Sequence, residues 1–325
     1  MINNKKIAAI IQARMTSTRL PGKVLMDLVG KSALQRVIER LRAAKTLDDV
    51  IVACTTNKED DPIISLCESL GCSYFRGSEE DVLSRVLETA RQFEVGVIVE
   101  ITADCPLIDW NHVDSLVEQH YANNCDMTSN IIERTFPRGY DIRVFNTEAL
   151  ERVNKEVDNP IDRQHVSTFA YLNPKGKENY TCQNWTAPTG QNRPDIEVTL
   201  DTPEDLELIR WIFSFESQGY NVDLTCQNVI NLLDTYPHML EKVSKIQRKD
   251  YFEELDQWYY HIDKIAKEII SGDPTRDEKP VGIFNALKDS VKKGAKKQDE
   301  KVERTDSRGR KSRSPVGRTG KRSGK

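Results

Sequence analysis

The chain has 325 residues, 38% of them hydrophobic, and a formal net charge of −4. Its length suits one large domain or two ordinary ones. Residues 291–325 carry 14 basic and 4 acidic side chains (net +10), so the other 290 residues carry a net charge of −14. An acidic body argues against an extended nucleic-acid surface there and leaves contact with nucleic acid or anionic surfaces open for the basic tail.

The first half of the chain alternates predicted strands and helices. Apolar or β-branched runs predict strands at 6–13, 50–54, 73–75 and 95–102. Apolar residues at helical spacing predict helices at 31–44, 62–70, 79–93 and 110–121. Gly71 is expected to end the second of these helices. This alternation predicts an α/β fold with a mostly parallel sheet and helices on both faces.

The second half of the chain is less regular. Strands are expected at 126–130, 140–145 and 197–200, and helices at 147–153, 164–172, 203–217, 227–234 and 237–270. From about residue 271 too little apolar surface remains to offset chain entropy, so a disordered tail is expected. The predicted division is therefore a folded domain at 1–248, a C-terminal helix at 249–272 and a basic tail at 273–325.

Membrane-spanning and disulfide-rich classes are both disfavoured. The longest apolar runs are too short to cross a bilayer, and the N-terminus lacks the features of a cleavable secretory signal. The seven cysteines are scattered and contain no CxxC pair, which favours buried reduced thiols over a disulfide framework or zinc site. A cytoplasmic protein is therefore expected.

The loop after the first predicted strand is rich in cations and hydroxyl groups. Its sequence, residues 10–23, is IIQARMTSTRLPGK, and it contributes Arg14, Arg19 and Lys23. Ligands of open α/β sheets bind at the carboxyl ends of strands, and such a loop suits a polyphosphate. It is neither a Walker loop nor GxGxxG, which argues against P-loop NTPases and dinucleotide dehydrogenases. From these residues alone, a surface loop with solvated cations is an equally good interpretation.

Two carboxylates also follow predicted strands. Asp104 comes after the strand at 95–102, although a turn or cap before Pro106 explains it better from the residues alone. Asp201 precedes a helix in which Thr202 can serve as N-cap and Pro203 as first residue. Asp201 is then available for another role; the alternative is that Asp201 itself caps the helix.

The segment from Gln12 to Lys23 strongly resembles the signature loop of the SpsF-type cytidylyltransferases of spore coat polysaccharide biosynthesis. It is more distantly similar to the enzymes that activate 3-deoxy-manno-octulosonate and sialic acids with CTP. Further strings that resemble the family are GSEEDVLSR (77–85), DCPL (104–107), FPRGYD (136–141), DRQHVS (162–167) and DTPEDL (201–206). The chain departs from the family pattern at Ser84, where Asp is common, and at Gln164, where relatives carry Glu.

The resemblance spans about residues 5–240 and implies a fold and a reaction. The fold is three-layer and Rossmann-like, of the GT-A nucleotide-diphospho-sugar transferase type. The reaction converts a sugar acid or sugar phosphate, with a nucleoside triphosphate such as CTP, into a nucleotide sugar and pyrophosphate for surface polysaccharide or glycan synthesis. Family members commonly form homodimers, so a homodimer is expected.

The resemblance also implies the site residues. Mg²⁺ is expected on Asp104 and Asp201, which with Arg14 and Lys23 form the expected catalytic set. The residues expected at the nucleotide are Gln12, Ala13, Arg14, Thr16, Ser17, Lys23, Gly77, Ser78 and Asp104. Those expected at the sugar are Arg138, Asp141 and His165.

A smaller set of expectations concerns the start of the helix at 79–93. Ser78 is expected to cap it, and Asp81 and Arg85 are expected to form an i,i+4 ion pair on its polar face.

Two other functions remain open from the sequence. A glycosyltransferase using a nucleotide sugar shares the fold class, but usually carries Asp-x-Asp where this chain has Asp104-Cys105-Pro106. The second open function is that of a non-catalytic protein, which binds a nucleotide or sugar and docks partners through its basic tail.

Overall fold

The structure is a computed structural model that describes residues 5–217, 223–246, 251 and 253–258. The chain divides into two compact units, Met1–Glu254 and Leu255–Lys325, and the fold and the site below belong to the first. Within the described residues no helix is long and apolar enough to cross a membrane. The predicted tail at 273–325 lies outside the described residues, and the predicted boundaries at 248 and 272 stay predictions.

A seven-stranded sheet forms the centre of the first unit, in the order β3-β2-β1-β4-β6-β5-β7. The strands are β1 (Lys6–Gln12), β2 (Asp49–Thr55), β3 (Ser73–Gly77), β4 (Val95–Thr102), β5 (Met127–Ser129), β6 (Arg143–Asn146) and β7 (Cys182–Asn184). Strands β1 to β4 run parallel, whereas β6 is antiparallel to its neighbours β4 and β5. The parallel strands carry nearly continuous apolar runs because both faces of the sheet are covered.

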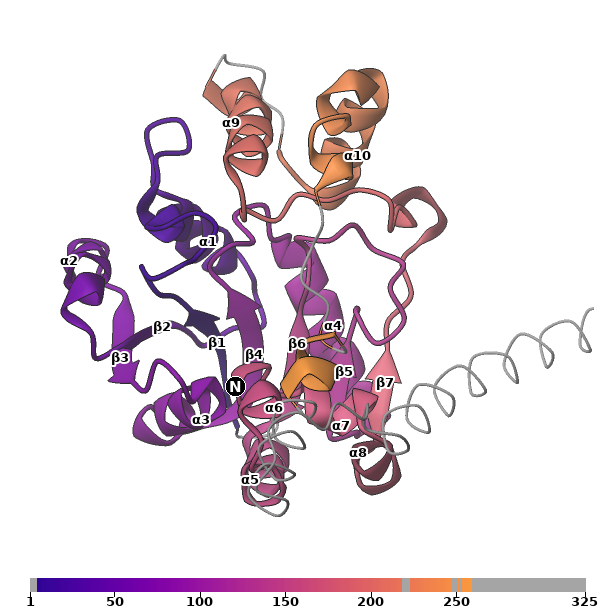
Figure 1. Cartoon of the computed structure of the whole chain (residues 1–325). Helices are drawn as coiled ribbons and strands as arrows, with labels where there is room; N and C mark the ends of the chain where they lie inside the picture. Colours follow the sequence, from indigo (N-terminus) through magenta and orange to yellow (C-terminus); the bar gives the residue numbers. More distant parts are fainter. Residues whose placement is uncertain (1–4, 218–222, 247–250, 252, 259–325) are drawn as a thin grey trace, which may run out of the picture. The chain divides into compact units, whose positions relative to one another are not determined.

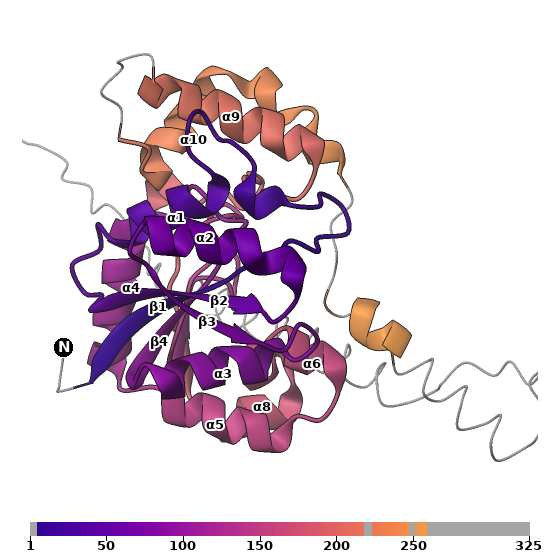
Figure 2. The same cartoon turned by 90° about the vertical axis from the view of Figure 1, so that its left-hand side faces the viewer.

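Helices pack on both faces of this sheet (Figure 1 and Figure 2). One apolar cluster joins the sheet to α1 (Ala33–Leu41), α2 (Asp61–Ser69) and α4 (Trp110–Asn123). A second joins the opposite face to α3 (Val82–Gln92), α5 (Thr147–Glu156) and α7 (Thr168–Leu172). Successive residues of β1 alternate between the two clusters, as the strand period of two requires. The predicted three-layer α/β fold with a mostly parallel sheet is therefore confirmed.

A third apolar cluster surrounds α9 (Pro203–Ser217) and α10 (Cys226–Thr235), both close to their predicted positions. The remaining short elements are α6 (Pro160–Gln164), α8 (Pro174–Asn179), and the 3-10 turns η1 (Lys23–Leu25), η2 (Lys58–Asp60), η3 (Thr189–Gln191), η4 (Pro237–Leu240) and η5 (Val243–Lys245). Gly71 has φ +55° and follows the end of α2, as expected of a glycine that ends a helix.

Three predictions in the second half are wrong in part. The helix expected at 164–172 is two helices, because the chain turns at Val166, whose φ is +56°. Residues 197–200 form one isolated bridge and no strand, since the amides of Val198 and Leu200 donate to the carbonyls of Arg138 and Asp104 in neighbouring loops. The helix expected from residue 237 begins instead as two 3-10 turns. Of the helix expected at 249–272, residues 251 and 253–258 are described and helical.

Candidate active site

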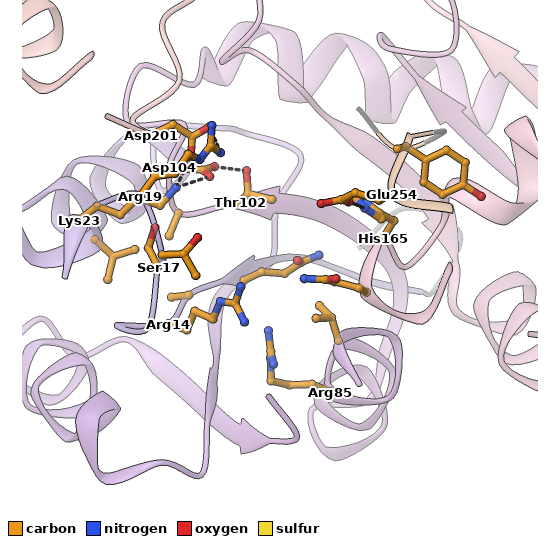
Figure 3. Close-up of a pocket in the computed structure, with 18 residues that line it drawn as sticks. Arg14, Ser17, Arg19, Lys23, Arg85, Thr102, Asp104, His165, Asp201 and Glu254 are labelled. Atoms are coloured by element: carbon orange, nitrogen blue, oxygen red, sulfur yellow. Dashed lines mark hydrogen bonds and ion pairs between the residues drawn. The ribbon is translucent and has the colours of Figure 1, made fainter. Parts of the chain in front are cut away.

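A cleft of about 290 Å³ lies at the carboxyl ends of β1 and β4 (Figure 3). Its walls come from the loop between Gln12 and Val24, from residues 102–104 at the end of β4, and from α3. Asp201, residues 164–165, Tyr251 and Glu254 complete the lining. The structure thus brings the cationic loop and both predicted carboxylates to one site, as expected of an open α/β sheet.

Lys23 bridges the two carboxylates. Its Nζ lies 2.8 Å from Asp104 Oδ2 and 2.8 Å from Asp201 Oδ1. Arg19 adds an ion pair of 2.8 Å to the other oxygen of Asp201. Thr102 donates its hydroxyl to Asp104 Oδ1 at 2.5 Å. Two cations and two carboxylates therefore form one network at this end of the cleft.

The network favours the charged forms of Lys23 and Asp104. Burial opposes the charge on Lys23, but Asp104 and Asp201 outweigh it and raise the pKa of the ammonium. Burial likewise opposes ionisation of Asp104, but Lys23 and the Thr102 hydrogen bond outweigh it and lower the pKa of that carboxyl. A negatively charged carboxylate and a positively charged Lys23 are therefore both present at neutral pH.

The start of α9 presents Asp201 to this network. The amide of Asp205 donates to Thr202 Oγ1 at 3.3 Å, and Asp205 Oδ2 in return accepts from the amide of Thr202 at 2.8 Å. This reciprocal capping box confirms Thr202 as the N-cap. The alternative in which Asp201 caps the helix is wrong, and the side chain of Asp201 turns to Lys23 and Arg19 instead.

The loop after β1 is fixed from behind by acidic residues that the sequence did not single out. Asp60 accepts from the amide of Met15 at 2.7 Å. Glu79 accepts a short hydrogen bond from Thr16 and pairs with Arg14 at 3.4 Å. The hydrogen bond from Thr16, more than the charge of Arg14, lowers the pKa of Glu79. Thr16 thus shapes the loop from outside the cleft lining, whereas Arg14 is part of that lining.

Gln12 is positioned by a carboxylate buried in the sheet. Its Nε2 donates to Glu100 Oε1 at 2.7 Å, and Ser167 donates to Oε2 at 3.0 Å. Glu100 is 2% exposed and also pairs with Arg143 at 3.3 Å. A buried glutamate needs such partners. A single Glu inside the apolar run of β4 was the sequence signal that could have identified it.

The start of α3 differs from the prediction in two ways. Asp81, and not Ser78, caps the helix by accepting from the amide of Ser84 at 2.9 Å. Asp81 pairs with Arg163 at 2.6 Å and not with Arg85. The predicted surface pair is therefore wrong, because a partner distant in sequence occupies Asp81.

Arg85 is instead a buried cation in the cleft wall. It is 3% exposed, donates to the carbonyl of Ser78, and has no ion-pair partner among the described residues. Burial, followed by repulsion from Arg14, lowers its pKa to about 10. Gly77 and Ser78 lie outside the lining; a Cβ on Gly77 would stand 2.8 Å from Arg85 Cγ, so the glycine makes room for this side chain.

The predicted sugar-binding residues separate in the structure. His165 lines the cleft, with its Nε2 at 3.0 Å from Glu254 Oε2. Arg138 lies outside the lining and pairs with Glu197 at 3.1 Å. Asp141 also lies outside it and forms a double hydrogen bond, 2.8 Å each, with Arg134. Tyr251 and Glu254 are lining residues that the sequence did not suggest, since they follow the expected domain end.

The carboxylate pair fits a divalent cation of the magnesium type. Asp104 and Asp201 already share one positive charge, the ammonium of Lys23, at hydrogen-bond distance. Within the described residues no group of three or more Asp, Glu, His or Cys side chains is placed to hold a metal. Two carboxylates suffice for Mg²⁺ when phosphate oxygens and water supply its other ligands.

Comparison with known proteins agrees with this geometry. A protein-family model described as cytidylyltransferase matches residues 8–256. The spore coat polysaccharide biosynthesis protein SpsF of Bacillus subtilis is 30% identical over 236 residues, which are 71% of this chain and 95% of that protein. An uncharacterised protein of Methanocaldococcus jannaschii is 38% identical over 254 residues, 76% of this chain and 98% of its own length. A solved cytidylyltransferase of Leptospira borgpetersenii superposes with a TM-score of 0.67 at 28% identity, over 76% of this chain and 100% of that one.

Proposed function

The chain belongs to the cytidylyltransferase family, and on this premise we propose that it transfers the cytidylyl group of CTP to a sugar acid or sugar phosphate. The products are a nucleotide sugar for surface polysaccharide synthesis and pyrophosphate. The observation that carries the proposal is the site built by Lys23, Asp104 and Asp201 beside the cationic loop at the ends of β1 and β4.

The reaction exchanges one phosphorus–oxygen bond for another. An oxygen of the sugar attacks the α-phosphorus of CTP, and the bond from that phosphorus to the bridging oxygen of the β-phosphate breaks. The bonding electron pair leaves with pyrophosphate, so negative charge grows on the leaving group. Catalysis of this kind depends mainly on positioning and on fixed positive charges.

The chain supplies such charges along one loop. Arg14, Arg19 and Lys23 all line the cleft, and Ser17 adds a hydroxyl donor between them. These groups suit the oxygens of a triphosphate and offset the charge that develops on pyrophosphate. The hydrogen bonds that Thr16 donates to Glu79 and the Met15 amide donates to Asp60 keep the loop in place before the substrate arrives.

Asp104 and Asp201 are the residues that would hold Mg²⁺. When bound, the ion supplies positive charge next to the phosphate oxygens. The two carboxylates come from the end of β4 and the start of α9. The packing of α9 against Leu20, Leu28 and Leu107 in the third apolar cluster therefore helps to set their spacing.

One assay tests the function directly: pyrophosphate release from CTP, with GTP, ATP and UTP as controls, against a panel of sugar acids and sugar phosphates. Lys23→Ala should lower turnover by about tenfold or more, because a fixed charge at the phosphates is lost. Lys31→Ala, which removes an exposed lysine paired with Glu39 at 2.6 Å, is the matched control and should leave turnover unchanged. Unchanged pyrophosphate release in a folded Lys23→Ala variant would contradict the assignment.

Two finer points belong to the same proposal. We place the reaction in the cytoplasm, which the seven cysteines support, since none of them forms a disulfide. We also propose that the enzyme is a homodimer, which light scattering of the purified chain tests.

A further inference from the structure

The cleft has a second end that differs in chemistry from the first. Lys23, Asp104 and Asp201 lie at one end, and His165 and Glu254 lie across the cleft from them (Figure 3). Whereas the first end carries closely spaced ion pairs, the second offers an imidazole, a carboxylate, the amide of Gln164 and the ring of Tyr251.

The side chains of this second end hold one another in place. His165 Nε2 lies 3.0 Å from Glu254 Oε2, and the two side chains remain 34% and 24% exposed. The ring of Tyr251 meets that of His165 edge-on, with ring centres 5.3 Å apart. The hydroxyl of Tyr251 donates a short hydrogen bond to Asp162, which is 1% exposed in α6. Tyr251 and Glu254 are thus tied to α6 and to the adjacent His165 at the wall of the cleft.

This combination of groups is suited to a polyhydroxylated ligand. A carboxylate accepts hydrogen bonds from hydroxyl groups, an amide and an imidazole both donate and accept, and an aromatic ring covers apolar C–H surface. The partial exposure of His165 and Glu254 leaves them accessible from the cleft. Arg138 and Asp141, in contrast, are engaged with Glu197 and Arg134 outside the cleft lining.

We propose that Gln164, His165, Tyr251 and Glu254 form the acceptor subsite, which binds the hydroxyl groups of the sugar that receives the nucleotidyl group. The proposal rests on the proposed function and adds a place for its second substrate. The subsite needs the chain beyond residue 246, so the catalytic unit extends to at least Glu254.

The test compares kinetics for the two substrates in the full-length enzyme. Glu254→Gln preserves the shape of the side chain and removes its charge, and should raise the KM for the acceptor by about tenfold or more while the KM for CTP changes by less than about threefold. Glu241→Gln, on a residue exposed outside this cleft, is the matched control and should alter neither value. Tyr251→Ala should act on the acceptor in the same sense as Glu254→Gln.

The rival placement of the sugar is tested in parallel. Arg138→Gln should leave the acceptor KM unchanged; an increase in that variant together with normal kinetics of Glu254→Gln would overturn the proposal. A rise in the KM for CTP alone in Glu254→Gln would also overturn the proposal, since Glu254 would then contribute to nucleotide binding and not to acceptor binding. Circular dichroism of each variant separates these outcomes from misfolding, and Glu254→Asp should recover part of the acceptor affinity.

Failure of the proposed function gives a different result. A wild-type enzyme that releases no pyrophosphate with any sugar of the panel contradicts the reaction itself. Calorimetric titration with 3-deoxy-manno-octulosonate then tests the subsite alone. Binding that Glu254→Gln weakens by about tenfold supports the subsite, and equal binding in both proteins, or none in wild type, overturns it.

Discussion

Lys23 occupies the position between the two carboxylates that suit a divalent cation. It contacts Asp104 and Asp201 at 2.8 Å each, and its side chain is 10% exposed. An ammonium and a metal ion cannot both stand between these oxygens, because like charges at such distances repel strongly. A metal ion bound to these carboxylates would therefore compete with Lys23.

Replacing Lys23 by Met should expose this competition. In the absence of nucleotide, Mn²⁺ should bind Lys23→Met about tenfold more tightly than wild type, since two carboxylates lose their internal cation. The measurement is the free Mn²⁺ signal in electron paramagnetic resonance. Lys6→Met removes a lysine paired at 2.8 Å with Asp49 outside the cleft and should have no effect. Equal Mn²⁺ affinity in wild type and Lys23→Met would show that Lys23 does not compete with the metal ion for the two carboxylates.

Gly77 leaves room for the side chain of Arg85 in the cleft wall. A methyl group at residue 77 would lie 2.8 Å from Arg85 Cγ, closer than two carbon atoms approach without strain. We expect Gly77→Ala to displace Arg85 from the cleft wall and to lower kcat/KM by about tenfold while costing about 1–3 kcal/mol of stability. Gly96→Ala, where the new Cβ would meet Lys5 Cβ at 2.9 Å away from the cleft, is the control. Enzyme kinetics and urea unfolding measure both effects; equal activity loss in the two variants would count against a role for Arg85.

At the scale of elements, the parallel strands and their helices follow the predicted order because each carries its own apolar period. The predictions that failed concern short segments whose partners are distant. Residues 197–200 place their amides on loop carbonyls, and the chain turns at Val166 between α6 and α7. No local pattern encodes such partners.

The N-cap of α9 links an element to the site. Thr202→Ala should lower the free energy of unfolding by about 1 kcal/mol, because the amide of Asp205 loses its acceptor. It should also lower activity, since the cap directs the adjacent Asp201 to Lys23. Thr225→Ala at α10 removes an equivalent 3.3 Å cap on Asn228 away from the cleft. The Thr225→Ala variant should lose similar stability and keep full activity. Full activity in both variants would show that the cap does not position Asp201.

At the scale of the whole molecule, the charge divides between two parts of the chain. Residues 1–290 carry a net charge of −14, and the cationic loop and Arg85 gather positive charge at one cleft in this acidic body. The net charge of +10 on residues 291–325 lies beyond the family match, which ends at residue 256. The total net charge of −4 is the sum of these two opposite contributions.

Deletion of residues 275–325 should therefore leave catalysis intact. The cleft uses residues up to Glu254, so kcat/KM for CTP should change by less than about twofold. Truncation after residue 248, which also removes Tyr251 and Glu254, should instead impair use of the acceptor. Steady-state pyrophosphate release measures both. Loss of activity in the shorter deletion would show that the tail takes part in catalysis.

The sequence by itself determined the α/β order, the cationic loop at the end of β1, the carboxylate of Asp104 after β4 and the cap of α9. These features depend on local periodicity and on neighbouring residues, which a single sequence displays. Only the tertiary structure decided that Lys23 bridges Asp104 and Asp201, that Arg85 faces the cleft while Asp81 pairs with Arg163, and that Tyr251 and Glu254 join His165. The physical reason is the same in each case: a side chain's partner is selected by packing between segments far apart in the chain, and no local pattern specifies that choice.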